Sequence, residues 1–314
     1  MDNFTLSIII TTRNRANDLN NCISSILSSK FIDNFEIIII DDSSEDDTSL
    51  YDDAYFIKKH GFENITIYHL KKKSMMVRAR NIGIKLAKAQ KYVLFIDDDN
   101  EIDPYMINKL INFANLNKSF GIIGPSMYYF DNKKKYLDYQ RINLFTGKTK
   151  GIISKKAKDF YESDGIPNVF MIRTELFKKY GMFDERLIQT FTEPDFAFSL
   201  KKHGIKCCII PDAVTFHKIQ SWYDYRSLGG RYSQKAYCLM RNRFIIIKRY
   251  GNSFNKIVFL LFFSWLWPIL YSSIIFARGE KYGLIGLYWK GFKDGVYYFL
   301  TSKFKISIKL DKLN

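Results

Sequence analysis

The sequence has few cysteines and no pattern that would pair them. Its 314 residues include four, Cys22, Cys207, Cys208 and Cys238. They form no CxxC pair and no cysteine-histidine spacing of the kind that holds zinc. Neither a structural zinc site nor a disulfide framework is supported, so we expect a reducing compartment.

A targeting signal and the two common glycine-rich nucleotide motifs are also missing. Asp2 is followed by an apolar run of β character, without the basic start and small-residue cleavage site of a secretory signal. Neither GxGxxG nor GxxxxGKS/T follows the first predicted strand. We therefore expect no dinucleotide fingerprint and no P-loop, and an N-terminal part that stays in the cytoplasm.

Acidic residues are scarce in the last third of the chain. Residues 218–314 contain 17 lysines and arginines but only four acidic residues, a surplus of +13 out of the formal net charge of +16. Together with the high aromatic fraction of 17%, this surplus suits an anionic membrane surface. We expect no nucleic-acid partner, because no recognisable nucleic-acid-binding module accompanies the charge.

Apolar runs alternate with amphipathic stretches over the first hundred residues. Each predicted strand is followed after a short link by a predicted helix, which indicates a mostly parallel sheet with helices on both faces. Strands are expected at 6–11, 35–40, 65–68 and 92–96, and helices at 18–29, 48–59, 76–88 and 104–116.

Polar side chains directly follow three of these strands, at Thr11–Arg13, Asp41–Ser44 and Asp97–Asp99. Ligands of open α/β sheets bind beyond the carboxyl ends of the strands, so we expect the three clusters to meet in one crevice. Three adjacent carboxylates require a positive partner, and oxygen ligands suit Mg²⁺ or Mn²⁺. The triplet Asp97–Asp99 therefore predicts a divalent metal site.

Beyond the triplet the pattern is less regular. Residues 131–160 are rich in lysine and contain few apolar runs, so we predict a mobile or substrate-covering segment. The acidic element Thr192–Asp195 opens another helix. The remaining elements are expected to be strands at 121–125, 169–172, 209–211 and 214–217, and helices at 174–180 and 196–202.

The tail is predicted to be helical. Residues 223–250 place basic side chains among apolar ones at helical spacing, and residues 257–277 contain no ionisable side chain. The second stretch is long enough to cross a bilayer. A central Pro268 and basic residues on both sides, Lys256 and Arg278, argue against a clean span. We favour a helix or broken helical pair lying in the membrane interface over a span or a buried core helix.

Six short motifs resemble, in this order, those of family 2 glycosyltransferases of the A-type fold. They are Thr11–Arg15, Asp41–Ser44, Arg78–Gly83, Phe95–Asp99, Gly181–Glu185 and Glu193–Asp195. Two later stretches, Arg241–Arg243 and Lys290–Gly295, resemble the tail of the rhamnosyltransferase-like branch. The resemblance implies a catalytic domain at 1–220, with a nucleotide half at 1–100 and an acceptor half at 101–220, and a membrane-associated tail at 221–314.

The resemblance also implies a reaction, namely inverting transfer of a sugar from a nucleotide-diphosphate donor to a glycan hydroxyl. The acceptor would be a lipid-linked or polysaccharide glycan at the cytoplasmic face of the membrane. The residues implied to bind the donor are Thr11, Arg13, Asp41, Asp42, Arg80, Asp97 and Asp98. Those implied to hold Mg²⁺ or Mn²⁺ are Asp97, Asp99 and His217.

By the same resemblance the catalytic base lies in the acidic element, at Glu193 or Asp195. The family's usual Glu-Asp pair is replaced here by Glu193-Pro194, so the choice between the two acids is open. Two alternative functions also remain. One is a polyprenyl-phosphate sugar synthase, whose phosphate acceptor needs no base. The other is a non-catalytic protein that binds an anionic membrane or nucleic acid.

Overall fold

The computed structural model describes residues 4–31, 33–219, 234–279 and 282–308, which form two compact units. The first consists of residues 1–141, 151–183 and 196–221, and the second of residues 142–150, 184–195 and 222–314. Two short segments expected in the catalytic domain thus belong to the second unit. The domain boundary predicted at residues 220 and 221 lies outside the described residues.

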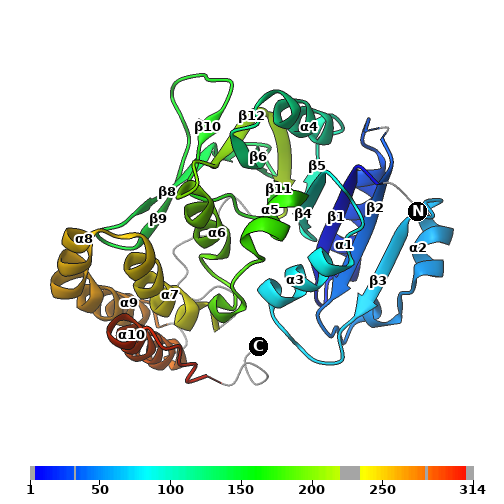
Figure 1. Ribbon diagram of the computed structural model, residues 1–314. Coiled ribbons are helices and arrows are strands. Elements are labelled where there is room, and N and C mark those ends of the chain that lie inside the picture. The colour runs from blue at the N-terminus through cyan, green and yellow to red at the C-terminus, as the bar shows by residue number, and fades with distance from the viewer. Residues whose placement is uncertain (1–3, 32, 220–233, 280–281, 309–314) are drawn as a thin grey trace. The chain divides into compact units, whose positions relative to one another are not determined.

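A ten-stranded mixed sheet forms the centre of the first unit (Figure 1). Its strand order is β10-β12-β6-β11-β4-β1-β2-β3, with β5 beside β12 and β7 beside β6. The four strands β4, β1, β2 and β3 are mutually parallel, whereas β11 runs antiparallel to both β4 and β6. The strands are β1 Leu6–Thr12, β2 Phe35–Asp41, β3 Ile65–His69, β4 Tyr92–Asp97, β5 Asn100–Ile102, β6 Phe120–Tyr129, β7 Lys135–Leu137, β10 Tyr161–Glu162, β11 Val169–Arg173 and β12 Lys206–His217.

Helices cover both faces of this sheet, because its central strands are apolar on both sides. Ile8 and Ile10 of β1 pack in one cluster with α1 and α4, whereas Ile9 packs in a second cluster with α3, α5 and α6. The helices that precede β12 in the chain are α1 Ala16–Leu27, α2 Asp53–His60, α3 Met76–Leu86, α4 Met106–Leu116, α5 Thr174–Tyr180 and α6 Thr192–Lys201.

Three elements differ from their prediction. The helix expected at 48–59 is divided into a 3₁₀ turn, Asp47–Leu50, and α2, because the Asp52 side chain accepts from the amide of Tyr55 and starts a new helix there. The two strands expected at 209–217 are one strand, β12, with a register shift between Ile210 and Val214. In residues 131–160, where the sequence predicts no strand, the structure has β7 and the two-stranded sheet of β8 Tyr139–Asn143 and β9 Lys148–Ile152. That this segment is mobile or covers the substrate stays a prediction.

From residue 234 on, the described part of the second unit is helical, as the sequence predicts for the tail. One continuous helix, Ser253–Arg278, contains a π-helical turn where α8 meets α9. It packs with α7 and α10 around Phe244, Phe259, Trp267 and Tyr288. The elements are α7 Gln234–Tyr250, α8 Ser253–Val258, the π turn Phe259–Phe263, α9 Ser264–Arg278 and α10 Gly283–Thr301.

Gly83 marks the closest approach of α3 to the sheet, which yields a first prediction. A Cβ atom there would lie 2.5 Å from Cγ2 of the buried Ile9, so Gly83→Ala should lower the free energy of unfolding by about 1–3 kcal/mol. Gly286 is the control, because a Cβ there meets nothing within 4 Å, and Gly286→Ala should leave stability equal or higher. Chemical denaturation measures both. Equal stability of the Gly83→Ala variant and the wild type would contradict this account of helix-sheet packing.

Candidate functional site

The polar clusters at the ends of β1, β2 and β4 lie at one edge of the sheet. Thr11 of β1 is in register with Asp97 of β4, and Thr12 is in register with Asp41 of β2. The backbone amide of Asp42 also donates to the carbonyl of Thr12 at 2.9 Å. We refer to the carboxyl ends of β1, β2, β3 and β4, with the C-terminal end of β12, as the acidic edge.

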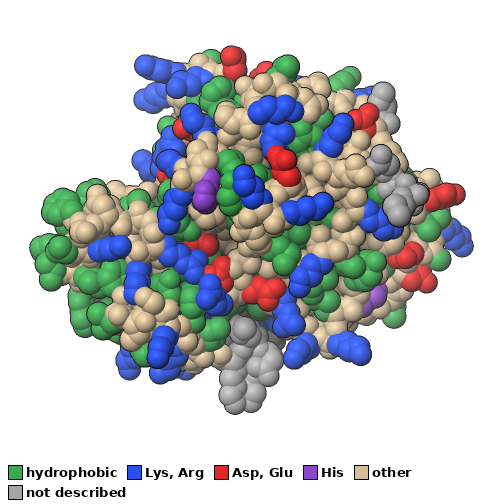
Figure 2. Space-filling view, in the orientation of Figure 1, with side chains coloured by type: hydrophobic (Ala, Val, Ile, Leu, Met, Phe, Trp, Pro, Cys, Tyr) green, Lys and Arg blue, Asp and Glu red, His purple; other side chains and the backbone are tan. Residues whose placement is uncertain are grey.

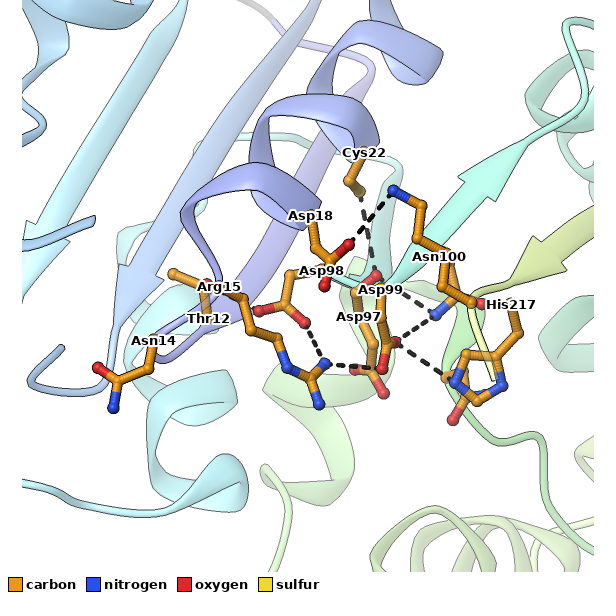
Figure 3. Close-up of polar contacts among 12 residues, drawn as sticks. Thr12, Asn14, Arg15, Asp18, Cys22, Asp97, Asp98, Asp99, Asn100 and His217 are labelled. Atoms are coloured by element: carbon orange, nitrogen blue, oxygen red, sulfur yellow. Dashed lines mark hydrogen bonds and ion pairs between the residues drawn. The ribbon is translucent and has the colours of Figure 1, made fainter. Parts of the chain in front are cut away.

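A single arginine of the β1–α1 loop holds two carboxylates of the acidic triplet together (Figure 3). Nη1 of Arg15 lies 2.7 Å from Oδ1 of Asp98 and 2.7 Å from Oδ2 of Asp99. The hydroxyl of Thr12 donates to the other oxygen of Asp98 at 2.7 Å. Asp98 is buried, with one partner at each oxygen, while the Asp99 side chain keeps a 20% exposure. Asp99 is therefore the more exposed of the two.

The two neighbouring carboxyls have opposite pKa shifts. Burial, helped by the charge of Asp99, raises the pKa of Asp98 to about 7, although Arg15 and Thr12 oppose the shift. Burial also acts to raise the pKa of Asp99, but the hydrogen bond and charge of His217, together with Arg15, outweigh it and hold this pKa well below its usual range. Asp99 is therefore the firmly ionised member of the pair.

His217 ends β12 beside the triplet. Its Nε2 lies 3.5 Å from Oδ1 of Asp99, and the Nδ2 amide of Asn100 donates to the same oxygen at 3.0 Å. Nδ1 of His217 lies 2.9 Å from the Tyr136 hydroxyl and 3.1 Å from the side-chain nitrogen of Asn168. The contacts at Nδ1 thus hold the imidazole ring with its Nε2 directed at Asp99 (Figure 3).

Arg80 of α3 holds the first aspartate of the triplet. Its guanidinium donates to Oδ1 of Asp97 at 2.6 Å and lies over the rings of Phe95 and Phe170. The sequence predicts that Arg80 meets a donor phosphate or sugar, and this role stays a prediction; 2% of its side chain is exposed. In the structure Arg80 contacts a carboxylate of the edge itself.

Asp41 and Asp42 order the neighbouring loops. Asp41 pairs with His69 at 2.7 Å and accepts from the amide of Ser44 at 3.0 Å. The Asp42 carboxylate accepts from the backbone amides of Ser74 and Met75, in the link before α3.

Two cationic side chains lie near this part of the edge. The guanidinium of Arg13 lies within 3.4 Å of Glu45. Burial and the charge of Arg13 lower the pKa of Lys73. Thr11 and Arg13, both partly exposed, complete this corner of the edge.

Backbone strain gathers in the loops of the same edge. Asn14, Ser43 and Met75, in the loops after β1, β2 and β3, have φ of 54°, 62° and 74°. Asn168, which directly precedes β11, has φ of 63°, and its carbonyl accepts from the amide of Asp97. Left-handed conformations of non-glycine residues are costly and collect at binding and catalytic sites.

The acidic element of the second unit is arranged differently. Glu193 and Asp195 lie in the first turn of α6, and Glu193 is partly exposed. Asp195 is buried, and its Oδ1 lies 2.8 Å from both Nη1 of Arg249 and the hydroxyl of Tyr250. Burial raises the pKa of Asp195, although Arg249 and Tyr250 oppose the shift. The two acids that the sequence left as alternatives therefore have different surroundings.

The side chains of the acidic edge could supply some of the ligands of a divalent ion but not a complete set. Among the described residues no three histidine, cysteine or acidic side chains are grouped closely enough to hold a metal. Asp99 and His217 do form a pair, and Asp97 ends β4 two residues before Asp99. Mg²⁺ commonly binds one or two carboxylates together with substrate phosphates and water, so this donor set is chemically suitable.

Sequence reasoning missed Arg15, Lys73 and Asn168. Arg15 was visible as the last residue of the Thr11–Arg15 motif, but no pattern says which carboxylate a loop arginine contacts. Asn168 stood next to a proline before a short strand, and only the pairing of β11 with β4 brings it to the edge.

The sequence of this chain matches a known protein family. Residues 7–181, more than half of the chain, match the model of glycosyl transferase family 2. Glycosyltransferase GlyG of Streptococcus pneumoniae serotype 4 is 24% identical over 180 residues, which cover 55% of this chain and 58% of GlyG. The poly(ribitol-phosphate) beta-N-acetylglucosaminyltransferase TarP of Staphylococcus aureus is 35% identical over 122 residues, which cover 38% of this chain and 36% of TarP. The chain thus spans little more than half of GlyG and about a third of TarP.

The fold has a counterpart among solved structures. The crystal structure of GalNAc-T7 with UDP, GalNAc and Mn²⁺ superposes with a TM-score of 0.60 at 16% identity, covering 77% of this chain and 48% of that chain. At this identity the likeness concerns the fold alone. With the family match over residues 7–181, it identifies the chain as a member of glycosyl transferase family 2 with the A-type glycosyltransferase fold.

Proposed function

We propose that this protein is an inverting, metal-dependent glycosyltransferase that moves a sugar from a nucleotide-diphosphate donor to a glycan hydroxyl. The observation that carries the proposal is the acidic edge, where the partly exposed Asp99 and His217 pair with each other close to Asp97 in a family 2 chain. The acceptor would be a lipid-linked or polysaccharide glycan, and the name of TarP, which states a polymer acceptor, supports this class. Membership of the rhamnosyltransferase-like branch stays a prediction.

The donor would bind along the ends of β1 and β2. Thr11 and Arg13 would line the nucleoside pocket, with Asp41 fixing the loop beside it. Asp42 already accepts two backbone amides, and a carboxylate has lone pairs left for a ring N–H of the base. Lys73 adds a positive charge for the donor phosphates.

The triplet would serve the diphosphate end of the donor. Asp99 and His217, with Asp97, would hold Mg²⁺ or Mn²⁺, which would neutralise the charge that develops on the leaving diphosphate. Arg15 and Arg80 fix the three carboxylates, so that they need little rearrangement when a cation arrives. Asp98, bonded to Thr12 and Arg15, would keep the turn after β4 in place.

Glu193 is the better candidate for the catalytic base. As the acceptor oxygen attacks the anomeric carbon from the face opposite the diphosphate, the bond to the diphosphate breaks and the hydroxyl proton passes to a carboxylate. Glu193 is partly exposed and lies in the first turn of α6, where the helix dipole favours the ionised form. Asp195 is less suitable, because its carboxylate is buried and bonded to Arg249 and Tyr250.

The second unit would attach the protein to the cytoplasmic face of the membrane. Ser253–Arg278 is the one helix of the described residues long and apolar enough to cross a bilayer. One side of it packs into the core through Phe259, Trp267 and Ile275. The opposite side exposes Leu261, Phe262, Trp265, Ile269 and Phe276, and Figure 2 shows hydrophobic side chains gathered over this part of the molecule.

This one-sided burial favours a helix that lies in the interface. A spanning helix would present apolar side chains to lipid around most of its circumference, whereas this helix has one face occupied by protein. The surplus of lysine and arginine in residues 218–314 adds attraction to anionic lipid.

The metal proposal predicts a loss of turnover on chelation and on neutralising Asp99. Asp99→Asn, or excess EDTA on the wild type, should lower kcat/KM with nucleotide sugars about 100-fold or more, because charge on the leaving diphosphate goes uncompensated. Glu101→Gln is the control, since Glu101 pairs with Lys218 rather than with the triplet, and should stay within about twofold. A radiolabelled panel of UDP-, GDP- and dTDP-sugars measures transfer, and full activity in EDTA would exclude metal dependence.

Removing the proposed base tests the acceptor class. Glu193→Gln should reduce transfer to hydroxyl acceptors about 10²–10⁴-fold, because an amide cannot take the proton. The exposed Glu185 of the same loop provides the control, and Glu185→Gln should retain activity. Unchanged turnover of the Glu193→Gln variant on a polyprenyl phosphate would instead identify a polyprenyl-phosphate sugar synthase.

Membrane attachment should depend on the exposed side of the Ser253–Arg278 helix. Replacing both Phe262 and Trp265 by Asp should lower partitioning onto vesicles with 30% anionic lipid at least tenfold, because each side chain loses roughly 1.5 kcal/mol or more of burial in lipid. Leu116→Asp, at a more exposed apolar residue of α4, should change nothing. Vesicle flotation measures both, and retention after alkaline carbonate extraction would instead indicate a span.

A further inference from the structure

The loop that leads into α6 is bonded at several points to α7. We propose that α7 positions the catalytic acid, with Asn242 and Arg249 as positioning residues that act through Glu193. This inference rests on the proposed role of Glu193 as the base. Residues 184–195 and α7 belong to the same unit, so every contact that follows lies within one compact body.

The backbone of this loop is strained. Ile188 and Phe191 have φ of 69° and 65°, and Ile188 is β-branched, so its left-handed conformation is a true outlier. Such a conformation is costly and persists only where its surroundings hold it. Both side chains are buried. Glu193 follows Phe191 by two residues, so the direction in which it leaves the loop depends on this turn.

Asn242 holds the strained turn on both sides of Ile188. Its fully buried side-chain amide donates to the carbonyl of Leu187 at 2.8 Å and to the carbonyl of Thr190 at 2.8 Å. The neighbouring Arg241 donates to the carbonyl of Arg186. Two consecutive residues of α7 thus donate hydrogen bonds to three carbonyls of one short stretch. These bonds hold the backbone of the left-handed turn in place.

Arg249 closes the loop by joining its two ends. One nitrogen of its guanidinium lies 2.6 Å from Oδ2 of Asp184, and another lies 2.8 Å from Oδ1 of Asp195. The hydroxyl of Tyr250 donates to the same oxygen of Asp195. A planar guanidinium with two carboxylates fixes orientation as well as distance. The first turn of α6, including Glu193, is thereby oriented by the end of α7.

The arrangement also explains why the acidic element carries two acids. Asp195 is the acid that anchors the helix, and Glu193, two residues earlier and partly exposed, is the acid proposed to meet an acceptor. A base held in this way should lose rate when the anchor is removed, while the donor remains bound, because the donor residues belong to the acidic edge of the other unit.

The test compares Arg249→Met, Arg249→Lys and Asn242→Asp with a cation on the same helix end. Asn242→Asp preserves the shape but removes both N–H donors. Lys248→Met is the control, because Lys248 contacts Tyr298 and Ser302 of the α10 end rather than the loop. Each variant is assayed for kcat and acceptor KM, for Mn²⁺-dependent binding of the nucleotide sugar by calorimetry, and for folding by circular dichroism.

We expect kcat to fall about 100-fold in Arg249→Met and Asn242→Asp, with donor binding within about threefold of the wild type. Arg249→Lys should recover part of the rate, since an ammonium ion reaches one carboxylate but not both, and Lys248→Met should keep it. The decisive measurement is the double variant Glu193→Gln, Arg249→Met. Residues that act through one another are not additive, so it should be no slower than Glu193→Gln alone.

The outcomes separate this inference from the function on which it rests. A wild type that transfers no sugar from any donor overturns both. An active wild type whose folded Arg249→Met and Arg249→Lys variants keep full kcat overturns the positioning role alone. So does a double variant that is 100-fold slower than Glu193→Gln, because Arg249 would then act independently of Glu193.

Discussion

Three carboxylates stand side by side where a buried strand ends, and the rest of the site depends on the cations that hold them there. Like charges at this spacing repel strongly in a partly desolvated setting, and an uncompensated buried charge is among the most destabilising features of a protein. Arg15 forms ion pairs with Asp98 and Asp99, and Arg80 forms one with Asp97. Because one arginine comes from the loop after β1 and the other from α3, the same contacts connect β1, β4 and α3.

This pairing gives the acidic edge two kinds of acid. Asp98 is buried, and its pKa is raised to about 7, so it behaves as part of the framework. Asp99 is ionised and exposed enough to meet a ligand. The second unit also contains two kinds of acid, since Asp195 is buried and bonded to Arg249, whereas Glu193 is partly exposed. In both places one acid is buried and a nearby acid is partly exposed.

The elements that could be predicted from the sequence are those with local signals. Runs of branched side chains, such as residues 36–40 and 92–96, became central strands, and the polar residues that follow them meet because parallel strands end together. The acids of Asp97–Asp99 were found for that reason. Their partners were not, since the contact of Arg15 with Asp98 joins residues 83 positions apart and no periodicity encodes it.

The larger omission concerns residues 184–195. Their sequence resembles part of a catalytic domain, yet their carbonyls are satisfied by Arg241 and Asn242, far along the chain. Composition and spacing also gave no signal for the left-handed Ile188, because isoleucine is among the residues least expected there. Tertiary hydrogen bonds decided the local conformation.

The interleaving of the two units has a consequence for how the protein is made. A ribosome extends a chain at roughly 5–20 residues per second, and domains generally fold as they emerge. Every strand of the main sheet precedes α7 in the chain, whereas Arg249, the partner of Asp195, follows Asp195 by 54 residues. A nascent chain can therefore complete its donor-binding edge seconds before the loop carrying Glu193 is set. Under the proposed function, the newborn enzyme would acquire its nucleotide pocket first and its catalytic competence last.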